Sequence, residues 1–324
     1  MWILGIDVSK GELVVRLENE SGSVVKEGNF SNDAKGLHFL GLWLKKFGVE
    51  FSELRVCMES TNIYWEEAAE YFYAEGAIVH VVNPMRTKGF GQSQMQRNKT
   101  DKVDAKVIAH FTRACPDLKH WESPSPEQRK LRALNRHRES ILKTRTQHRN
   151  RLKVTKEPAV IELIQAVLSL LQEQLNEIKK QIAVLVKNNQ DLKEKLDLLI
   201  SIPGIGEKTA QIILAEMPDL EEYESARTAA ADAGLTPSRH ESGSSVKRRP
   251  RMSHMGKASI RCALFLPALA ALNRNPIIQE LEQRLEQRGK PRMVIVGAAM
   301  RKLMHIAYGV LKNRTPFNPQ IQAA

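Results

Sequence analysis

Eight apolar residues in the middle of the chain recur at alternating spacings of three and four without a gap. They are Ile161, Ile164, Leu168, Leu171, Leu175, Ile178, Ile182 and Leu185. Because an α-helix turns once in about 3.6 residues, this spacing draws one narrow apolar stripe along a long helix. Such a stripe is typical of a coiled coil and predicts dimerisation, with a helical hairpin folding on itself as the alternative.

The segment before this stripe is strongly basic. From Arg129 to Lys156 it has eleven Lys or Arg residues against one acid, Glu139. This pattern favours a basic helix that grips RNA or DNA, and a solvated helical face is the alternative. The predicted contacts on it are Arg136, Arg145, Arg149 and Arg151. We therefore expect residues 121–195 to form a basic helix and a coiled-coil dimerisation region.

The chain as a whole carries a formal net charge of +12 and has an isoelectric point near 9.6. A basic protein concentrates polyanions around itself, either nucleic acid or an anionic membrane. The longest apolar stretch, from Cys262 to Leu272, is too short to cross a bilayer, and Met1 to Leu4 lack the basic flank of a secretory signal. We expect a cytoplasmic protein without membrane contact. The three cysteines are scattered and support neither a zinc site nor a disulfide.

The first 120 residues have the pattern of an α/β domain. Strands are expected at Trp2–Asp7, Glu12–Leu17, Val24–Phe30, Leu54–Met58 and Ala77–Val82, and helices at Ala34–Lys46 and Tyr64–Ala74. The first three strands should form a meander.

Four acids stand where a metal site would need them. Asp7 and Glu59 end two apolar strands, and Asp101 and Asp104 lie three residues apart, a spacing that puts both carboxylates on one face of a helix. Oxygen-only ligands favour Mg²⁺ or Mn²⁺. The alternative for each acid is an ordinary solvated side chain.

Residues 196–324 are expected to be mostly helical. Ile202 to Gly206 form a glycine-rich turn between two apolar helices, which resembles a helix-hairpin-helix whose backbone amides meet a phosphate. A plain helical turn is the alternative.

A Ser- and Gly-rich loop, Glu241 to Val246, lies within a cationic run of seven Lys or Arg and one acid between Arg239 and Arg261. Its hydroxyls could meet a DNA phosphate, but the loop supplies no local base to activate a serine. A flexible nucleic-acid-binding loop is the alternative. The predicted nucleic-acid contacts are Arg239, Lys247, Arg248, Arg249, Arg251 and Lys257.

The order of the motifs resembles a known family. The marks are Gly5-Ile6-Asp7-Val8-Ser9-Lys10, Met58-Glu59-Ser60-Thr61, Asn98-Lys99-Thr100-Asp101-Lys102-Val103-Asp104-Ala105, Ile202-Pro203-Gly204-Ile205-Gly206, Ala233-Gly234-Leu235-Thr236-Pro237 and Glu241-Ser242-Gly243-Ser244-Ser245. Taken together they are similar to the Piv-type DNA invertases and DEDD transposases of bacterial insertion sequences, which are bridge-RNA-guided recombinases.

This resemblance implies a RuvC-like, RNase H-like N-terminal domain in which Asp7, Glu59, Asp101 and Asp104 form the metal-binding tetrad. It also implies a C-terminal transposase domain whose catalytic serine matches Ser242. The resemblance further implies that DNA is cut through a covalent phosphoserine, with the serine domain of one protomer acting together with the carboxylate domain of another. The implied partners are donor and target DNA, a structured guide RNA and further copies of the chain, as a homodimer and as a tetramer in the active complex at the nucleoid.

One departure from the family pattern follows Thr61, where the family often has glycine and this chain has Asn62. Asparagine tolerates a left-handed backbone, so the turn is expected to survive.

Two other functions remain open. One is a RuvC-like hydrolytic nuclease such as a junction resolvase, in which water attacks and Ser242 only binds phosphate. The other is a non-enzymatic DNA- or RNA-binding protein.

Overall fold

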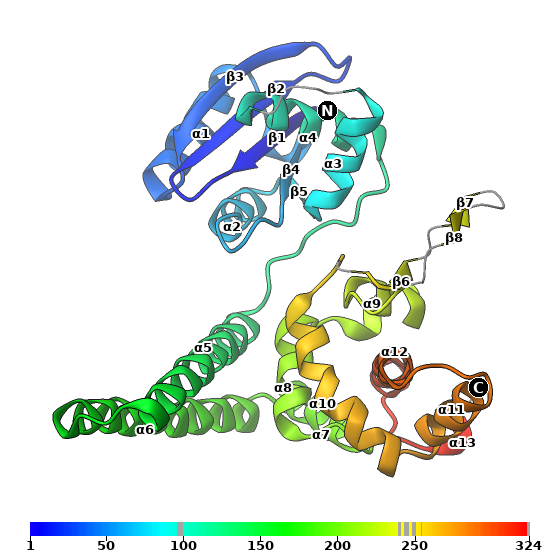
Figure 1. Cartoon of the computed structure of the whole chain (residues 1–324). Coiled ribbons are helices and arrows are strands. Elements are labelled where there is room, and N and C mark those ends of the chain that lie inside the picture. The colour runs from blue at the N-terminus through cyan, green and yellow to red at the C-terminus, as the bar shows by residue number, and fades with distance from the viewer. Residues whose placement is uncertain (96–99, 239–240, 243–245, 248–250, 254, 323–324) are drawn as a thin grey trace. The chain divides into compact units, whose positions relative to one another are not determined.

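The computed structural model describes residues 1–95, 100–238, 241–242, 246–247, 251–253 and 255–322 of the chain. The chain folds as two compact units, residues 1–124 and 125–324 (Figure 1). Each unit has its own hydrophobic core.

A five-stranded mixed sheet forms the centre of the first unit. Its strands are β1 (Trp2–Val8), β2 (Glu12–Glu18), β3 (Val24–Ser31), β4 (Leu54–Glu59) and β5 (Ile78–Val82). The order across the sheet is β3-β2-β1-β4-β5; β2 is antiparallel to β1 and β3, and β4 is parallel to β1 and β5. The predicted meander and the α/β class of this region are confirmed.

Helices cover both faces of this sheet. Leu4 and Ile6 of β1 share one core with α1 (Ala34–Lys46) and α2 (Glu66–Ala74), and the short 3₁₀ helix η1 (Phe51–Glu53) leads into β4. On the other face α3 (Pro84–Ser93) and α4 (Asp101–Ala114) pack around Cys57. The two faces of the sheet thus pack against different helices. The predicted acids Asp7 and Glu59 lie on the face that α4 covers.

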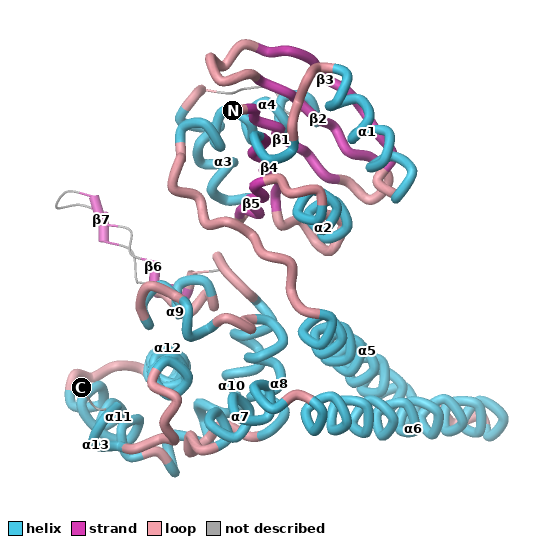
Figure 2. The backbone as a smooth tube through the Cα atoms, turned by 180° about the vertical axis from the view of Figure 1, so that it is seen from behind, coloured by secondary structure: helices cyan, strands magenta, loops and turns pink. Residues whose placement is uncertain are grey.

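Two long helices open the second unit. They are α5 (Pro126–Val154) and α6 (Pro158–Asn188), and they pack on each other (Figure 2). Of the predicted stripe, Ile164, Ile178, Ile182 and Leu185 are buried, and the last three share one core with Leu131 and Ile141 of α5. Within this chain α5 and α6 therefore form a helical hairpin, which was the alternative prediction for the apolar stripe.

The rest of the second unit is mostly helical, as expected. It contains α7 (Gln190–Ile200), α8 (Glu207–Glu216), η2 (Leu220–Glu222), α9 (Ala226–Asp232), α10 (Ala258–Arg274), α11 (Pro276–Gln287), α12 (Arg292–Lys312) and α13 (Pro319–Gln322). The described residues between α9 and α10 include four two-residue strands, namely β6 (Pro237–Ser238), β7 (Glu241–Ser242), β8 (Val246–Lys247) and β9 (Arg251–Met252).

Helix α12 is, among the described residues, the one helix long and apolar enough by length and composition to cross a membrane. A helix in the core of a protein can be equally long and apolar without crossing a membrane. Ile295, Leu303, Met304 and Leu311 of α12 are buried in the core of the second unit, and Arg301 stands in the middle of the helix. The packing of α12 accounts for its apolar composition.

The glycine turn between α7 and α8 packs closely against α10. Gly204 has a φ of +104°, and a Cβ added there would lie 2.8 Å from Ala271 Cβ and 2.9 Å from Pro267 O of α10. The carbonyl of Pro203 accepts a hydrogen bond from the buried Asn275. The turn requires glycine because α10 approaches it closely.

Candidate functional site

Two of the predicted acids lie at the ends of neighbouring parallel strands. The register pairs Ile6 of β1 with Met58 of β4, so Asp7 and Glu59 follow at the next position of each strand. Side chains alternate along a strand, and partners in register point to the same face. Asp7 and Glu59 therefore share the face on which Gly5 lies, opposite the core formed with α1 and α2. Both are half-buried.

Helix α4 carries the other two acids over this face. Thr100 caps the helix, since its hydroxyl accepts a hydrogen bond from the Val103 amide at 3.3 Å. The buried residues of α4 include Ala105, Ile108, Ala109 and Thr112. Asp101 and Asp104 continue this stripe into the first turn. Asp104 is half-buried and Asp101 is exposed.

A glycine sets the distance between α4 and β1. A Cβ on Gly5 would lie 2.5 Å from Ala105 O and 2.6 Å from Ala109 N. The backbone of α4 therefore rests directly on β1, which no other residue at position 5 permits without a shift. Asp104 immediately precedes Ala105, so this contact holds the first turn of α4 over the face that also carries Asp7 and Glu59.

The far end of α4 is held by charge. Glu18 at the end of β2 is fully buried and accepts a hydrogen bond from Arg16 Nε at 2.7 Å. From α4, Arg113 pairs with the same carboxylate and His110 Nε2 lies 3.3 Å from it. A buried carboxylate needs such partners, because losing one leaves an uncompensated charge. The α4 helix is thus anchored at both ends.

Glu59 has a partner that the sequence did not reveal. The Thr87 hydroxyl of α3 is buried and lies within hydrogen-bond distance of Glu59 Oε1 and of Pro84 O. Asn83 and Pro84 form the cap and first residue of α3, with Asn83 Oδ1 accepting from the Met85 amide at 2.9 Å. This Asn-Pro pair was the available signal for α3, a helix that is absent from the sequence-based expectations.

Asn62 follows β4 with a φ of 56°, a left-handed backbone. The expectation that the turn survives with asparagine at this position, in a left-handed backbone, is confirmed. The carbonyl of Asn62 accepts a hydrogen bond from Trp65 Nε1 at 3.0 Å, which ties the turn to the start of α2.

The acids have the chemistry of a hard-cation site. They offer carboxylate oxygens alone, the donors that Mg²⁺ and Mn²⁺ prefer, and α4 with Asp104 packs on the sheet face that carries Asp7 and Glu59. Among the described side chains, no three His, Cys, Asp or Glu residues already lie close enough together to hold a metal ion. The donor types and their common face fit a divalent cation.

Ser242 lies in the second unit on a small hairpin. β7 pairs with β8 antiparallel, with Ser242 opposite Val246. β6 pairs with β9, and the Thr236 carbonyl accepts a hydrogen bond from the Ser253 amide at 2.9 Å. The hairpin therefore has a defined base. Three predicted nucleic-acid contacts, Arg239, Arg248 and Arg249, lie outside the described residues, and for Lys247 the backbone alone is described.

The remaining predicted contacts differ in their surroundings. Arg149 and Arg151 of α5 and Arg251 of β9 are exposed. Lys257 pairs with Asp232 at 3.0 Å. The other two also have partners: Arg136 pairs with Glu216 at 3.0 Å, and Arg145 donates to Gln172 of α6 at 2.7 Å. The last turns of α5, with Arg149 and Arg151, thus expose their cations to solvent. Arg136 and Arg145, which come earlier in α5, make contacts within the second unit.

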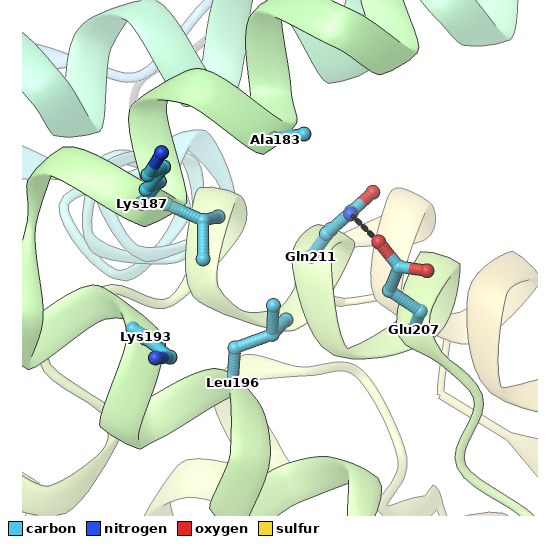
Figure 3. A pocket seen from close by; sticks show the side chains of 7 residues that line it. Ala183, Lys187, Lys193, Leu196, Glu207 and Gln211 are labelled. Carbon is cyan, nitrogen blue, oxygen red and sulfur yellow. Dashed lines mark hydrogen bonds between the residues drawn. The ribbon is translucent and has the colours of Figure 1, made fainter.

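A pocket lies where α6, α7 and α8 meet (Figure 3). Lys187 and Lys193 border it, and Glu207 accepts a hydrogen bond from Gln211 Nε2 at 3.0 Å. Gln211 in turn accepts from the buried Arg138 of α5 at 2.7 Å. None of the predicted catalytic residues lines this pocket, and its polar groups serve the junction of four helices.

Comparisons with known proteins give a consistent result. A transposase model of the IS110 DEDD type matches residues 4–155, and a model described as transposase IS116/IS110/IS902 family matches residues 196–283. The pilin gene-inverting protein of Moraxella bovis is 32% identical over 300 residues, which cover 90% of each chain. The transposase for insertion sequence element IS1328 of Yersinia enterocolitica is 25% identical over 276 residues, covering 74% of this chain and 75% of that protein.

Among solved structures, T. thermophilus RuvC in complex with a Holliday junction substrate matches with a TM-score of 0.29 and 16% identity. The match covers 37% of this chain and 99% of the RuvC chain.

Proposed function

The chain belongs to the IS110 family of DEDD transposases, and from this premise we propose that it cuts and rejoins DNA through a phosphoserine intermediate formed on Ser242. Membership supports a DNA recombinase. The observation that carries the carboxylate half of the proposal is that Asp7 and Glu59 share one face of the sheet in the first unit and that α4, which carries Asp104, packs on this face. The serine half rests on the motif that places Ser242 directly after Glu241.

In the proposed reaction the Ser242 hydroxyl oxygen attacks the phosphorus of a DNA phosphodiester. The bond from phosphorus to one deoxyribose oxygen breaks, and that oxygen leaves with a proton. The serine proton passes to a carboxylate or to water. A hydroxyl of another DNA end then attacks the phosphoserine and releases Ser242, which rejoins the DNA.

Asp7, Glu59, Asp101 and Asp104 would hold Mg²⁺ or Mn²⁺, which when bound stabilises negative charge at phosphorus. Thr87 orients Glu59. We propose three functional parts, namely residues 1–120 with the acids, 121–195 with the basic helix and hairpin, and 196–324 with the serine. Because the sequence offers no evident local base for Ser242, we assign its activation to the carboxylate unit of another protomer within a dimer or tetramer.

The test is denaturing electrophoresis of the protein incubated with labelled DNA and Mg²⁺. We expect a covalent adduct that maps to Ser242 and that Ser242→Ala loses while retaining DNA binding. Ser238→Ala, in the neighbouring strand β6, is the matched control and should keep the adduct. Cleavage without any adduct in the unmodified protein would replace this proposal with a hydrolytic nuclease.

We further propose that a structured guide RNA binds along α5. The support is the exposed Arg149 and Arg151 at its outer end. Since each neutralised phosphate releases a counterion, replacing both residues with glutamine should lower the salt slope of RNA binding by about 2, whereas Arg274→Gln should leave the slope unchanged. Protein that recombines DNA without any RNA would rule out guidance.

The proposed dimer needs a surface other than the stripe that packs on α5. A second apolar set on α6 is exposed at spacings of three and four, namely Val160, Leu163, Val167 and Leu170. Lysine at Leu163 and Leu170 should lower the mass measured by light scattering, because a dimer would then bury unpaired charge. An unchanged mass would remove this surface from the proposal.

A further inference from the structure

An open hollow lies between α1 and β3 in the first unit. It has a volume of about 640 Å³ and is lined by Phe30 of β3 and by five residues of α1, namely Phe39, Leu42, Trp43, Lys45 and Lys46. Phe39 is 61% exposed and Leu42 is 45% exposed. The proposed cutting and rejoining of DNA makes no use of this hollow.

Two of the aromatic rings that line the hollow are held by their neighbours. The rings of Phe30 and Trp43 meet edge to face with 5.6 Å between their centroids, and Trp43 meets Phe47 in the same way at 5.1 Å. Gly28 leaves room for both, because a Cβ there would lie 2.9 Å from Phe30 Cε2 and 3.6 Å from Trp43 Cζ2. These contacts fix the rings, so the hollow is preformed.

The surface around the hollow is cationic. From Lys35 onward the exposed residues of α1 are Lys35, His38, Phe39, Leu42, Lys45 and Lys46, and α1 contains no Asp or Glu. Lys26 of β3 is exposed and lies on the same face of its strand as Phe30, because both positions pair with core residues of β2. Asp33 caps α1 and accepts a hydrogen bond from the Gly36 amide at 2.8 Å. Lysines thus border an exposed aromatic surface.

Charge distinguishes between the possible occupants. A second copy that docked through its own α1 would bring lysines against lysines, which is unfavourable. An apolar peptide would cover Phe39 and Leu42 but would make no use of the lysines. An unpaired nucleotide offers both surfaces, since its base stacks on an aromatic ring while its phosphate meets a cation.

The hollow and the predicted acids lie on opposite faces of the sheet. Phe30 lies on the face that packs against α1, whereas Asp7 and Glu59 lie on the face that α4 covers. A strand held in the hollow is therefore not presented to the predicted metal site of its own unit. This arrangement suits a nucleic acid that is bound without being cut, which in the proposed function is the guide RNA.

We propose that the hollow between α1 and β3 binds an unpaired stretch of RNA, with a base stacked on Phe39 and phosphates at Lys26, Lys35 and Lys46. The choice of RNA rests on the proposed function, whereas the aromatic and cationic surface does not. The stretch is unpaired because stacking on a protein ring requires a base whose face is not covered by its neighbours in a duplex. The first unit would thus provide an RNA contact of its own, in addition to α5.

The test is fluorescence anisotropy of a labelled oligouridine with the full-length protein over a range of salt concentrations. Phe39→Ala should weaken binding by about 5- to 100-fold with an unchanged salt slope, because it removes a stacking surface and no charge. Phe39→Tyr keeps an aromatic ring and should bind as the unmodified protein does. Leu266→Ala removes an apolar residue of α10 that is 70% exposed and is the matched control, which should bind normally.

The lysines are tested by the salt slope itself. The double change Lys35→Gln with Lys46→Gln should lower the slope by about 1.4, since each phosphate contact of a single strand contributes about 0.7. The double change Arg288→Gln with Lys290→Gln removes two exposed charges beyond α11 and is the matched control. If the control lowered the slope as much, the effect would be one of general charge and the site would be refuted.

Other variants and ligands separate the competing occupants. Phe39→Leu keeps an apolar side chain without an aromatic ring, so full affinity for oligouridine in this variant would rule out stacking. A loss of oligodeoxyuridine binding in Phe39→Ala with unchanged oligouridine binding would overturn the assignment to RNA. Unchanged oligouridine binding with a lower mass in light scattering would instead assign the hollow to a contact between copies of the chain.

The same titrations distinguish this site from the proposed function. If oligouridine binding depends on Arg149 and Arg151 but not on Phe39, the hollow is refuted while RNA binding along α5 stands. If recombination needs no RNA and Phe39→Ala still weakens oligouridine binding, guidance fails while the site stands. Repeating the titration in a Ser242→Ala background should give the same loss for Phe39→Ala, because the serine chemistry plays no part in this binding.

Discussion

The acids of the first unit and the serine of the second unit are held in different ways. The acids lie at the ends of buried strands and in the first turn of a capped helix. Ser242 lies on a two-residue strand that is joined to the rest of its unit through the short strands β6 and β9. The positions of the acids follow from core packing, because Gly5 and Glu18 fix α4 on the sheet. The position of Ser242 depends on a few contacts around Thr236. We expect changes deep in the core to disturb the acids, and changes at the hairpin base to disturb the serine.

The largest effect should come from removing one acid. Asp104→Ala should lower DNA cleavage by at least about a thousandfold, because a metal site loses both a ligand and its charge balance. DNA binding and the unfolding transition should change little. Asp117→Ala, an exposed acid of the same unit, is the control. Full cleavage by Asp104→Ala in Mg²⁺ would show that the shared face is not the metal site.

A smaller effect is expected where the acid stays and its partner is lost. Thr87→Val removes the hydroxyl that meets Glu59 and should weaken Mn²⁺ binding by about 10- to 100-fold. Thr87→Ser keeps the hydroxyl and should restore binding. Isothermal titration measures both. Equal affinities for Thr87→Val and the unmodified protein would leave Thr87 as a packing residue.

The contact between α4 and β1 can be broken without touching an acid. Gly5→Ala should lower the free energy of unfolding by about 1–3 kcal/mol, because the new Cβ overlaps Ala105 and Ala109. Gly11→Ala is the control, since a Cβ there meets nothing within 4 Å. Denaturant titration provides the measurement. If Gly5→Ala were as stable as Gly11→Ala, the close approach would not set the position of α4.

The stability of the second unit should depend on pH through His305. The unfolded chain protonates His305 near pH 6.5, whereas burial and the neighbouring cations hold the folded pKa near 4. Between these values the unfolded state binds more protons, so stability falls as the pH drops from about 6.5 to 4 and the loss is absent above 6.5.

His305→Gln should remove part of this acid sensitivity in denaturant titrations at pH 7.5 and pH 5, whereas His137→Gln, exposed on α5, should not. An identical loss of stability for His305→Gln and the unmodified protein would place the pH dependence elsewhere.

Much of the first unit was predictable because its signals are local. The strand ends at Asp7 and Glu59 follow from apolar alternation, and the three-residue spacing of Asp101 and Asp104 predicts a shared helix face. Helix α3 was missed, since Pro84–Ser93 contains two glycines and no clear apolar stripe. Thr87 was missed with it, because its partner Glu59 lies 28 residues away.

In the second unit, periodicity identified the α6 stripe but not what covers it. The facing helix α5 has buried polar residues, Asn135 and Arg138, within its own stripe, so it did not look like a core helix. The surroundings of Arg301 also could not be predicted from the sequence. Arg301 meets Thr236 across 65 residues, and only the packing of α9 on α12 brings Arg227 near both Arg301 and His305.

The two long helices also set a length scale. A helix of 31 residues such as α6 is about 46 Å long, which equals the rise of about 13 base pairs of duplex. A nucleic acid lying along α5, which has 29 residues, would pass more than a full helical turn of its own backbone. Contacts to the nucleic acid would then be spread along α5. The binding affinity would therefore fall in steps as successive arginines are replaced.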